Sequence, residues 1–221
     1  IEKARIRANE YFEKAGILKQ DIPAVIGTVA QGPLNVIKAQ ALRVNAPLHL
    51  VDEDYHVQAD GTSINPLITY QGMGIEITQA ALGLSGMHQV YNAAIAITIV
   101  GLLKASFPNI TTATILEGLK KARWPGRLEL VSDSPPVFMD VAHNPAGCRV
   151  LAETFRQCIT VFAVSSDKNV SAMLDILAPI SSPFLLTEYS GSRSMPLAEL
   201  QIHCTNYPHK YCPDLRIAIK Q

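Results

Sequence analysis

The sequence has no excess of charge of either sign. Its 221 residues include 19 basic and 19 acidic side chains, so the formal net charge is +0. Surfaces that bind nucleic acid or anionic membranes need clustered lysine and arginine, and no such cluster is present. The longest apolar run, residues 93–103, is too short to cross a bilayer and is typical of a buried helix. No secretory signal is visible. We therefore expect a cytoplasmic protein with neither nucleic acid nor a membrane as a partner.

Cysteine is scarce, and its spacing excludes two common small-domain frameworks. The four cysteines form no CxxC pair. A disulfide framework is therefore not indicated, and reduced, buried thiols are expected. His203, Cys204, His209 and Cys212 are residue types that bind zinc, but their spacing matches no standard zinc finger. The segment PHKYCPDL instead reads as a short strand followed by a helix that starts at proline.

The hydrophobic pattern changes at WPGR, near residue 124, and we place a domain boundary there. Before this point, the sequence predicts helices over 1–15, 33–46, 88–105 and 112–122, strands at 23–27 and 47–51, and antiparallel hairpins within 52–80. After it, strands at 128–132, 137–141, 159–164, 183–187 and 207–211 alternate with helices at 145–157, 170–178, 196–202 and from 213 onward. Such alternation is typical of an α/β fold with a parallel, doubly wound sheet. Because helical patterns run into both ends, we expect a piece of a longer protein with an incomplete C-terminus.

Polar side chains follow two of the predicted parallel strands. The segment FMDVAHNPAG carries Asp140, His143 and Asn144 just beyond one strand, and Asp167 and Lys168 lie beyond the next. Ligands bind at the carboxyl ends of strands in such sheets. The alternative is that Asn144 or Asp140 only caps the following helix, which the local stretch by itself favours. Because a second strand end is also followed by polar residues, a binding site is about as well supported as a helix cap.

Four segments together resemble the folylpolyglutamate and dihydrofolate synthases of the Mur ligase superfamily. They are EKAGILK followed by PAVIG, then GMHQVYNAA, then WPGRLELVSDSPPVFMDVAHNPAG, and finally SSDKNVSAML with LLTEYSGSRSMP. Their order and spacing agree with the family pattern over nearly the whole chain. The resemblance implies the remainder of a Mur-type central ATP-binding domain over 1–124. A Rossmann-like, doubly wound, glutamate-binding domain over 125–221 would follow it.

The resemblance also implies a reaction. ATP phosphorylates a carboxylate of a pteroate or folate, and the amine of L-glutamate attacks the acyl phosphate to give an amide, ADP and phosphate. ATP and Mg²⁺ are the implied cofactors, and a monomer is expected. The substrate is left open between dihydropteroate and a reduced folate. One rival is a Mur-type ligase acting on a peptidoglycan precursor, against which GMHQVYNAA and DVAHNP favour the folate branch. A rival of another class is a non-catalytic nucleotide-binding protein.

Three residues match positions that contact ATP in this family. Asn92 would contact adenine, Asp140 the ribose or a nearby part of the nucleotide, and Arg127 the β- and γ-phosphates through its planar, always-charged guanidinium. Each has a plain structural alternative: a polar residue within a helix, a helix cap and a surface arginine, respectively. His88 and Gln89, in the same motif as Asn92, are interpreted as structural.

The remaining matches concern catalysis and glutamate. Lys14 would be a carbamylated lysine, whose added CO2 makes it a carboxylate-like group near magnesium, so its part in metal binding is indirect. His143 is predicted to be catalytic, and His143 and Asn144 are expected near the transferred phosphate or the incoming glutamate. Asp167 and Lys168 are candidates for the glutamate side.

Two features of the family pattern are missing from the sequence. No GxxxxGK[ST] phosphate loop occurs, and no histidine precedes EKAGI. The loop would cradle the triphosphate, and the histidine would bind the metal. We therefore expect the 221-residue chain to be inactive by itself.

Overall fold

The computed structural model describes residue 13 and residues 15–212, in two compact units, Ile1–Glu129 and Leu130–Gln221. The division falls after Glu129, whereas the sequence predicted a boundary after residue 124. Each unit has its own hydrophobic core. The assignment of ATP to the first unit and of glutamate to the second stays a prediction.

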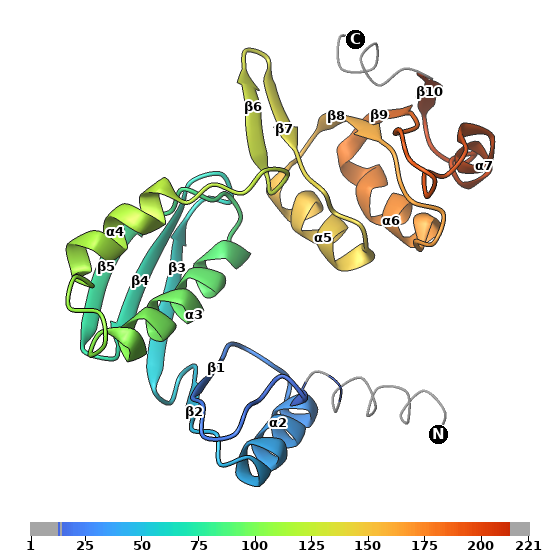
Figure 1. Cartoon of the computed structure of the whole chain (residues 1–221). Helices are drawn as coiled ribbons and strands as arrows, with labels where there is room; N and C mark the ends of the chain where they lie inside the picture. Colours follow the sequence, from blue (N-terminus) through green and yellow to red (C-terminus); the bar gives the residue numbers. More distant parts are fainter. Residues whose placement is uncertain (1–12, 14, 213–221) are drawn as a thin grey trace. The chain divides into compact units, whose positions relative to one another are not determined.

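The first unit combines a parallel pair of strands with an antiparallel sheet (Figure 1). The strand β1 (Ala24–Ile26) pairs in parallel with β2 (Leu48–Leu50), and α2 (Gln31–Arg43) connects them. The antiparallel sheet has the order β3 (Tyr55–Gly61), β4 (Pro66–Gly72), β5 (Ile75–Ala81). It is followed by α3 (His88–Leu103), which packs on β3 and β4, and by α4 (Thr112–Lys121), which packs on β5.

The apolar helix α3 is anchored to this sheet by a core and by one buried polar contact. The core consists of Tyr55, Ile68, Tyr70, Ile75, Ile77, Val90, Ala94 and Ile97. Thr98 is fully buried, and its hydroxyl bonds to the Tyr70 hydroxyl at 2.9 Å and donates to the Ala94 carbonyl at 2.8 Å. Buried polar groups need such partners to avoid a desolvation cost of about 1–3 kcal/mol. The start of α3, which carries Asn92, is therefore held in a fixed place.

Local capping defines the start of α4. The Thr111 hydroxyl accepts from the Thr114 amide at 3.2 Å, and the Thr114 hydroxyl accepts from the Thr111 amide at 2.9 Å. This reciprocal pair satisfies two amides at the start of the helix. The observed range, Thr112–Lys121, is one residue shorter than predicted.

The second unit is an α/β layer preceded by a two-stranded sheet of β6 (Glu129–Asp133) and β7 (Pro136–Met139). Its elements are then α5 (Pro145–Thr154), β8 (Cys158–Phe162), α6 (Val170–Leu177), η1 (Ala178–Ile180), β9 (Ser181–Leu186), α7 (Leu197–His203) and β10 (His209–Tyr211). The parallel sheet has the order β10-β9-β8. The predicted α/β fold class is confirmed, with parallel and antiparallel sheets both present.

One detail differs from the predicted parallel sheet. Among the described residues, β6 and β7 pair with each other and are not part of the β10-β9-β8 sheet. Only a short turn separates them, which favours local pairing. The strand β7 ends at Met139 and not at residue 141, because the carboxylate of Asp140 accepts a hydrogen bond from the Ala142 amide and turns the chain.

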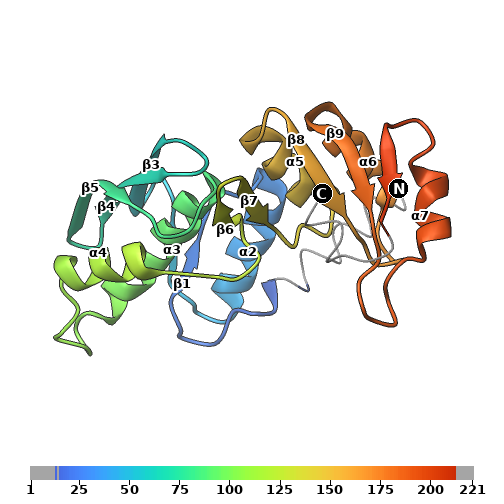
Figure 2. The ribbon, with the colours of Figure 1, turned by 90° about the horizontal axis from the view of Figure 1, so that it is seen from above.

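The helices of the second unit bury an apolar layer against the parallel sheet. Phe162 of β8 and Phe184 and Leu186 of β9 contribute to this core, together with Leu174 of α6 and Leu200 of α7. The helix α6 contacts both α5 and α7, and Figure 2 shows these elements from a second direction. The carboxyl ends of β8 and β9 therefore lead out of a packed layer, where polar side chains can be held in place.

Within residues 15–212, no helix is both long enough and apolar enough to span a membrane.

Candidate functional site

A cavity of about 330 Å³ lies in the first unit. The residues that line it come from the loop after β5, the first turns of α3 and the loop after α4; they are Leu84, His88, Gln89, Asn92, Trp124 and Arg127. Small-molecule sites are typically about 300–1,000 Å³, with apolar walls and a few polar groups. This cavity lies at the small end of that range, a size that suits a heterocyclic base better than a whole nucleotide.

The polar part of the cavity is an amide pair on α3. The Asn92 side-chain Nδ2 donates to Oε1 of Gln89 at 3.0 Å. The two side chains meet because residues three apart lie on the same face of a helix. Gln89 is only 8% exposed, so its amide is held by its surroundings. Gln89, which the sequence interpretation took as structural, contacts Asn92 and lines the same cavity.

Arg127 reaches the cavity from a tight turn. Its amide bonds to the Trp124 carbonyl at 3.3 Å, and the Gly126 amide bonds to Glu129 Oε2 at 2.8 Å. Gly126 has φ +70°, a conformation that glycine adopts without steric cost. Among the described residues, the exposed Arg127 guanidinium has no hydrogen bond or ion pair. The turn thus presents a cation beside the amide pair, an arrangement suited to an anionic ligand with a flat polar base.

In the second unit, Asp140 lies directly after β7 and is half-buried. Its Oδ1 accepts from the Ala142 amide at 2.7 Å. The carboxylate also lies near the Cys148 thiol, whose pKa is raised to about 11 by burial and, to a smaller extent, by the charge of Asp140. Asp140 therefore shapes the loop, and it carries a charge at a strand end.

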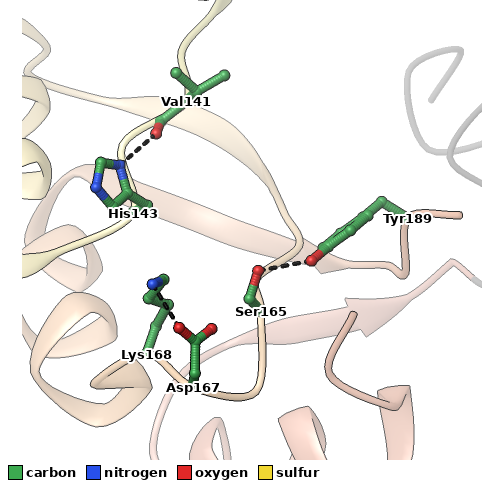
Figure 3. Close-up of polar contacts among 6 residues, drawn as sticks. All are labelled: Val141, His143, Ser165, Asp167, Lys168 and Tyr189. Atoms are coloured by element: carbon green, nitrogen blue, oxygen red, sulfur yellow. Dashed lines mark hydrogen bonds and ion pairs between the residues drawn. The ribbon is translucent and has the colours of Figure 1, made fainter. Parts of the chain in front are cut away.

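His143 is exposed on the same loop, and its ring Nδ1 bonds to the Val141 carbonyl at 3.2 Å (Figure 3). A carbonyl only accepts, so Nδ1 carries the hydrogen in this bond. The other ring nitrogen, Nε2, is then an acceptor when the ring is neutral. The loop thus orients a histidine that can take up a proton.

Asn144 is the N-cap of α5, and its Oδ1 accepts from the Gly147 amide at 2.8 Å. Pro145 occupies the first helical position, which favours a helix start. The cap that the sequence analysis weighed as an alternative is therefore present. A glutamate contact through the side-chain amide of Asn144 stays a prediction.

Replacing Asn144 tests the contribution of the cap. Asn144→Ala is expected to lower the free energy of unfolding by about 1 kcal/mol, because the cap is lost. Asn144→Asp keeps an accepting oxygen for Gly147 and should retain stability, as measured by urea unfolding. If both variants leave stability unchanged, the cap contributes nothing and this interpretation of the side chain is wrong.

Asp167 and Lys168 lie beyond β8 and form an ion pair, with Lys168 Nζ 2.7 Å from Asp167 Oδ2 (Figure 3). The hydrogen bond from Lys168 is the main cause that lowers the pKa of Asp167, and the positive charge of Arg193 adds to it. Arg193 is therefore a second cation near this strand end. Arg193 lies in the segment LLTEYSGSRSMP, but no role for it was predicted from the sequence.

A second contact joins the ends of β8 and β9. The Ser165 and Tyr189 hydroxyls lie 2.6 Å apart, and the Tyr189 amide donates to the Ser194 hydroxyl at 3.2 Å. In Figure 3 this pair, the Asp167–Lys168 pair and His143 are seen around the same end of the sheet. Ser165 and Tyr189 therefore lie at the same end of the sheet as the predicted residues His143, Asp167 and Lys168. No sequence signal had singled out Ser165 or Tyr189.

Two sequence-based considerations concern metal: the residue types that can bind zinc, and Lys14. Between residues 15 and 212, no three His, Cys, Asp or Glu side chains gather as a metal site would require. His209 instead bonds through Nδ1 to the Tyr207 carbonyl at 2.7 Å and through Nε2 to the Tyr211 hydroxyl at 2.6 Å. Lys14 lies outside the described residues.

Sequence comparison with known proteins finds relatives of one kind. No family model matches the chain. The chain is 34% identical over 190 residues to "Dihydrofolate synthase/folylpolyglutamate synthase" of Bacillus subtilis, a match that covers 82% of this chain and 44% of the relative. It is 29% identical over 205 residues to the protein of the same name from Mycobacterium tuberculosis, covering 86% of this chain and 42% of the relative. The chain thus spans less than half the length of these relatives.

Structural comparison agrees with these two sequence matches. The folylpolyglutamate synthase of Mycobacterium tuberculosis, complexed with ADP and AMPPCP, superposes with a TM-score of 0.86 at 29% identity, over 96% of this chain and 51% of that one. The fold is therefore shared over nearly the whole of this chain. The predicted family resemblance is confirmed.

Proposed function

Because this chain is a relative of the folylpolyglutamate and dihydrofolate synthases over most of its length, we propose that it provides part of an ATP-dependent ligase. The ligase joins the amine of L-glutamate to a carboxylate of dihydropteroate or of a reduced folate. The observation that carries the proposal is the cavity of the first unit. Asn92 and Arg127 lie 35 positions apart in the sequence, both match ATP-contacting positions of the family, and both line this cavity.

The nucleotide assignment follows from the chemistry of the cavity. The amides of Asn92 and Gln89 offer both a donor and an acceptor to the edge of adenine. The guanidinium of Arg127 is suited to phosphate oxygens. During transfer, the bond between the γ-phosphate and ADP breaks and a bond to the substrate carboxylate forms. A positioned cation stabilises the charge that shifts in this step.

The second unit would handle the amino acid. The amine of glutamate attacks the acyl carbon, phosphate leaves, and the amine gives up a proton. His143 is the proton acceptor that we propose, through Nε2. Lys168, with Arg193 nearby, provides positive charge for a glutamate carboxylate, and Asn144 offers an amide N–H.

When bound, Mg²⁺ would supply positive charge that offsets the negative charge of the reacting groups. The described residues hold no cluster of metal ligands, so we assign the ion no ligand among them. Carbamylated Lys14 is the one group of this chain that we propose to contribute to metal binding, and its contribution is indirect. We further propose a monomer that acts in the cytoplasm.

A chimera tests the proposal. Residues 1–221 would replace the matched part of the Bacillus subtilis relative, and glutamate-dependent ADP formation would be followed with dihydropteroate or tetrahydrofolate. We expect activity with at least one of them. A folded chimera that binds ATP but transfers no glutamate would favour the rival, a non-catalytic nucleotide-binding protein. Activity only with a peptidoglycan precursor would favour the other Mur-type branch.

Asp140→Asn in the chimera tests the proposed ribose contact. Asparagine keeps an accepting oxygen for the Ala142 amide, so the loop is preserved while the charge is lost. The KM for ATP should rise about tenfold, equivalent to about 1.4 kcal/mol, and the KM for glutamate should change much less. Equal changes in the two KM values would show that Asp140 does not serve the nucleotide.

A further inference from the structure

The two loops that flank the cavity are joined by one arginine. Arg123 follows α4, and its Nη1 donates to the carbonyls of Ala122 at 2.8 Å, Lys120 at 2.9 Å and Gly83 at 3.3 Å. The last carbonyls of a helix lack partners within the helix, and a cation there is favourable. The bond to Gly83 adds a second function, because it reaches 40 positions back in the sequence.

Gly83 allows this contact because it has no side chain. A Cβ at this position would lie 2.3 Å from Arg123 Nη1, 2.4 Å from the Lys120 carbonyl oxygen and 2.5 Å from that of Ala122. The Gly83 amide also donates to the Leu119 carbonyl at 2.9 Å. The loop after β5 is therefore held against the end of α4 by bonds in both directions. We refer to the Arg123–Gly83 contact and these backbone partners as the Arg123 clamp.

The Arg123 clamp sits between two walls of the cavity. Leu84 follows Gly83 directly, and Trp124 follows Arg123 directly, and both line the cavity. Loss of the clamp would let these two walls separate, whereas the amide pair on α3 is anchored independently by the core.

Trp124 has the properties of a ligand-contacting residue. Its side chain is 66% exposed, although it is large and apolar, and it lines the same cavity as the Gln89–Asn92 amide pair. An aromatic face beside paired amides matches a heterocyclic base, which offers one face for stacking and one edge for hydrogen bonds. Bases commonly stack on aromatic side chains in this way, because every base has a flat π-face.

We propose that Trp124 stacks against the base in this cavity and that Arg123 is a positioning residue, which holds Trp124 in place through the clamp to Gly83. The proposal rests on the proposed function, since it takes the base to be the adenine of ATP. Neither residue belonged to the sites predicted from the sequence.

The test uses the full 221-residue chain and millimolar adenosine, which isolates base binding from phosphate binding. Trp124 is the one tryptophan of the chain, so adenosine should change the intrinsic fluorescence saturably. Saturation-transfer NMR on the adenine protons follows the same binding without the indole. Ribose should produce neither signal. Trp124→Leu should weaken adenosine binding about tenfold by NMR, and Trp124→Phe should keep most of the affinity.

Arg123→Met should weaken adenosine binding severalfold and shift the emission of Trp124 before any ligand is added. Gly83→Ala should have the same effect, because the added Cβ pushes the loop away from Arg123. Lys121→Met is the matched control: it removes a positive charge at the same end of α4, where Lys121 pairs with Glu117 at 2.5 Å, and should leave both readouts unchanged.

The outcomes distinguish failure of the stacking role from failure of the positioning role and of the nucleotide site. If the wild-type chain responds to adenosine but Trp124→Leu binds it equally well, the stacking role is wrong and the proposed function stands. If Arg123→Met lowers only the melting temperature, Arg123 is a helix cap and not a positioning residue. If adenosine gives no signal with the wild-type chain, the cavity does not bind the base, and the stacking proposal is overturned.

Discussion

The 221-residue chain, purified by itself, is expected to form no ADP above a no-protein blank when given ATP, magnesium, L-glutamate and dihydropteroate or tetrahydrofolate. Its sequence contains Asn92, Asp140 and Arg127 for parts of the nucleotide, but no glycine-rich phosphate loop. Such a loop gives the triphosphate several backbone N–H bonds and a lysine, and each charge-assisted bond contributes about 1.5–3 kcal/mol. Without three of them, binding weakens by roughly 5–9 kcal/mol, or several powers of ten in Kd.

Calorimetry and a coupled ADP assay measure the two parts of this expectation. The chimera with the Bacillus subtilis relative is the matched control, because it contains this chain in a longer protein. Glutamate-dependent ADP formation by the 221-residue chain would contradict the expectation. Micromolar ATP binding without turnover would contradict its energetic basis and would show that the cavity and the exposed cation suffice for affinity.

Arg127→Ala in the chimera is expected to lower kcat roughly a hundredfold, because a charge-assisted contact to a phosphate in transfer is worth about 3 kcal/mol. Stability should change little. The side chain is exposed and, within the described residues, makes no ion pair. The turn that carries it is held by the bond from the Arg127 amide to the Trp124 carbonyl and by the bond from the Gly126 amide to the Glu129 carboxylate. The measurement is steady-state kinetics together with a melting curve.

Arg127→Lys should recover only part of the loss, since an ammonium group lacks the planar fork of guanidinium. Arg43→Ala, which removes an exposed arginine from the last turn of α2, is the control for a change in net charge. A lowered melting temperature with unchanged kcat in Arg127→Ala would reassign the residue to a structural role in the turn.

The helices around the first cavity could be predicted because their signals are local. The apolar run of α3 and the helical pattern of α4 placed both helices within two residues of the observed ends. Strand pairing was harder. The sequence placed 128–132 and 137–141 in the parallel sheet, but these segments form their own two-stranded sheet, because register and pairing depend on contacts that periodicity does not encode.

The polar contacts that shape the two candidate sites were beyond the reach of sequence patterns. Arg123 meets Gly83 across 40 positions, and Ser165 meets Tyr189 across 24. Neither residue type nor spacing predicts such pairs, since they arise from how the loops are packed. The family motif identified Asn92 as a candidate residue. Its hydrogen bond to Gln89 became evident only in the structure, where the two side chains lie on the same face of α3.

The ion pair between Asp167 and Lys168 means that any carboxylate ligand at this strand end would share the lysine with a group that the chain itself supplies. The lysine already faces a carboxylate that the chain itself supplies from the neighbouring position. A tethered group of this kind competes at a high effective concentration. A ligand that offers a single carboxylate therefore gains little by displacing it. Arg193 supplies further positive charge nearby, which helps to lower the pKa of Asp167. The chain's own carboxylate therefore weakens the attraction of Lys168 for any further anion.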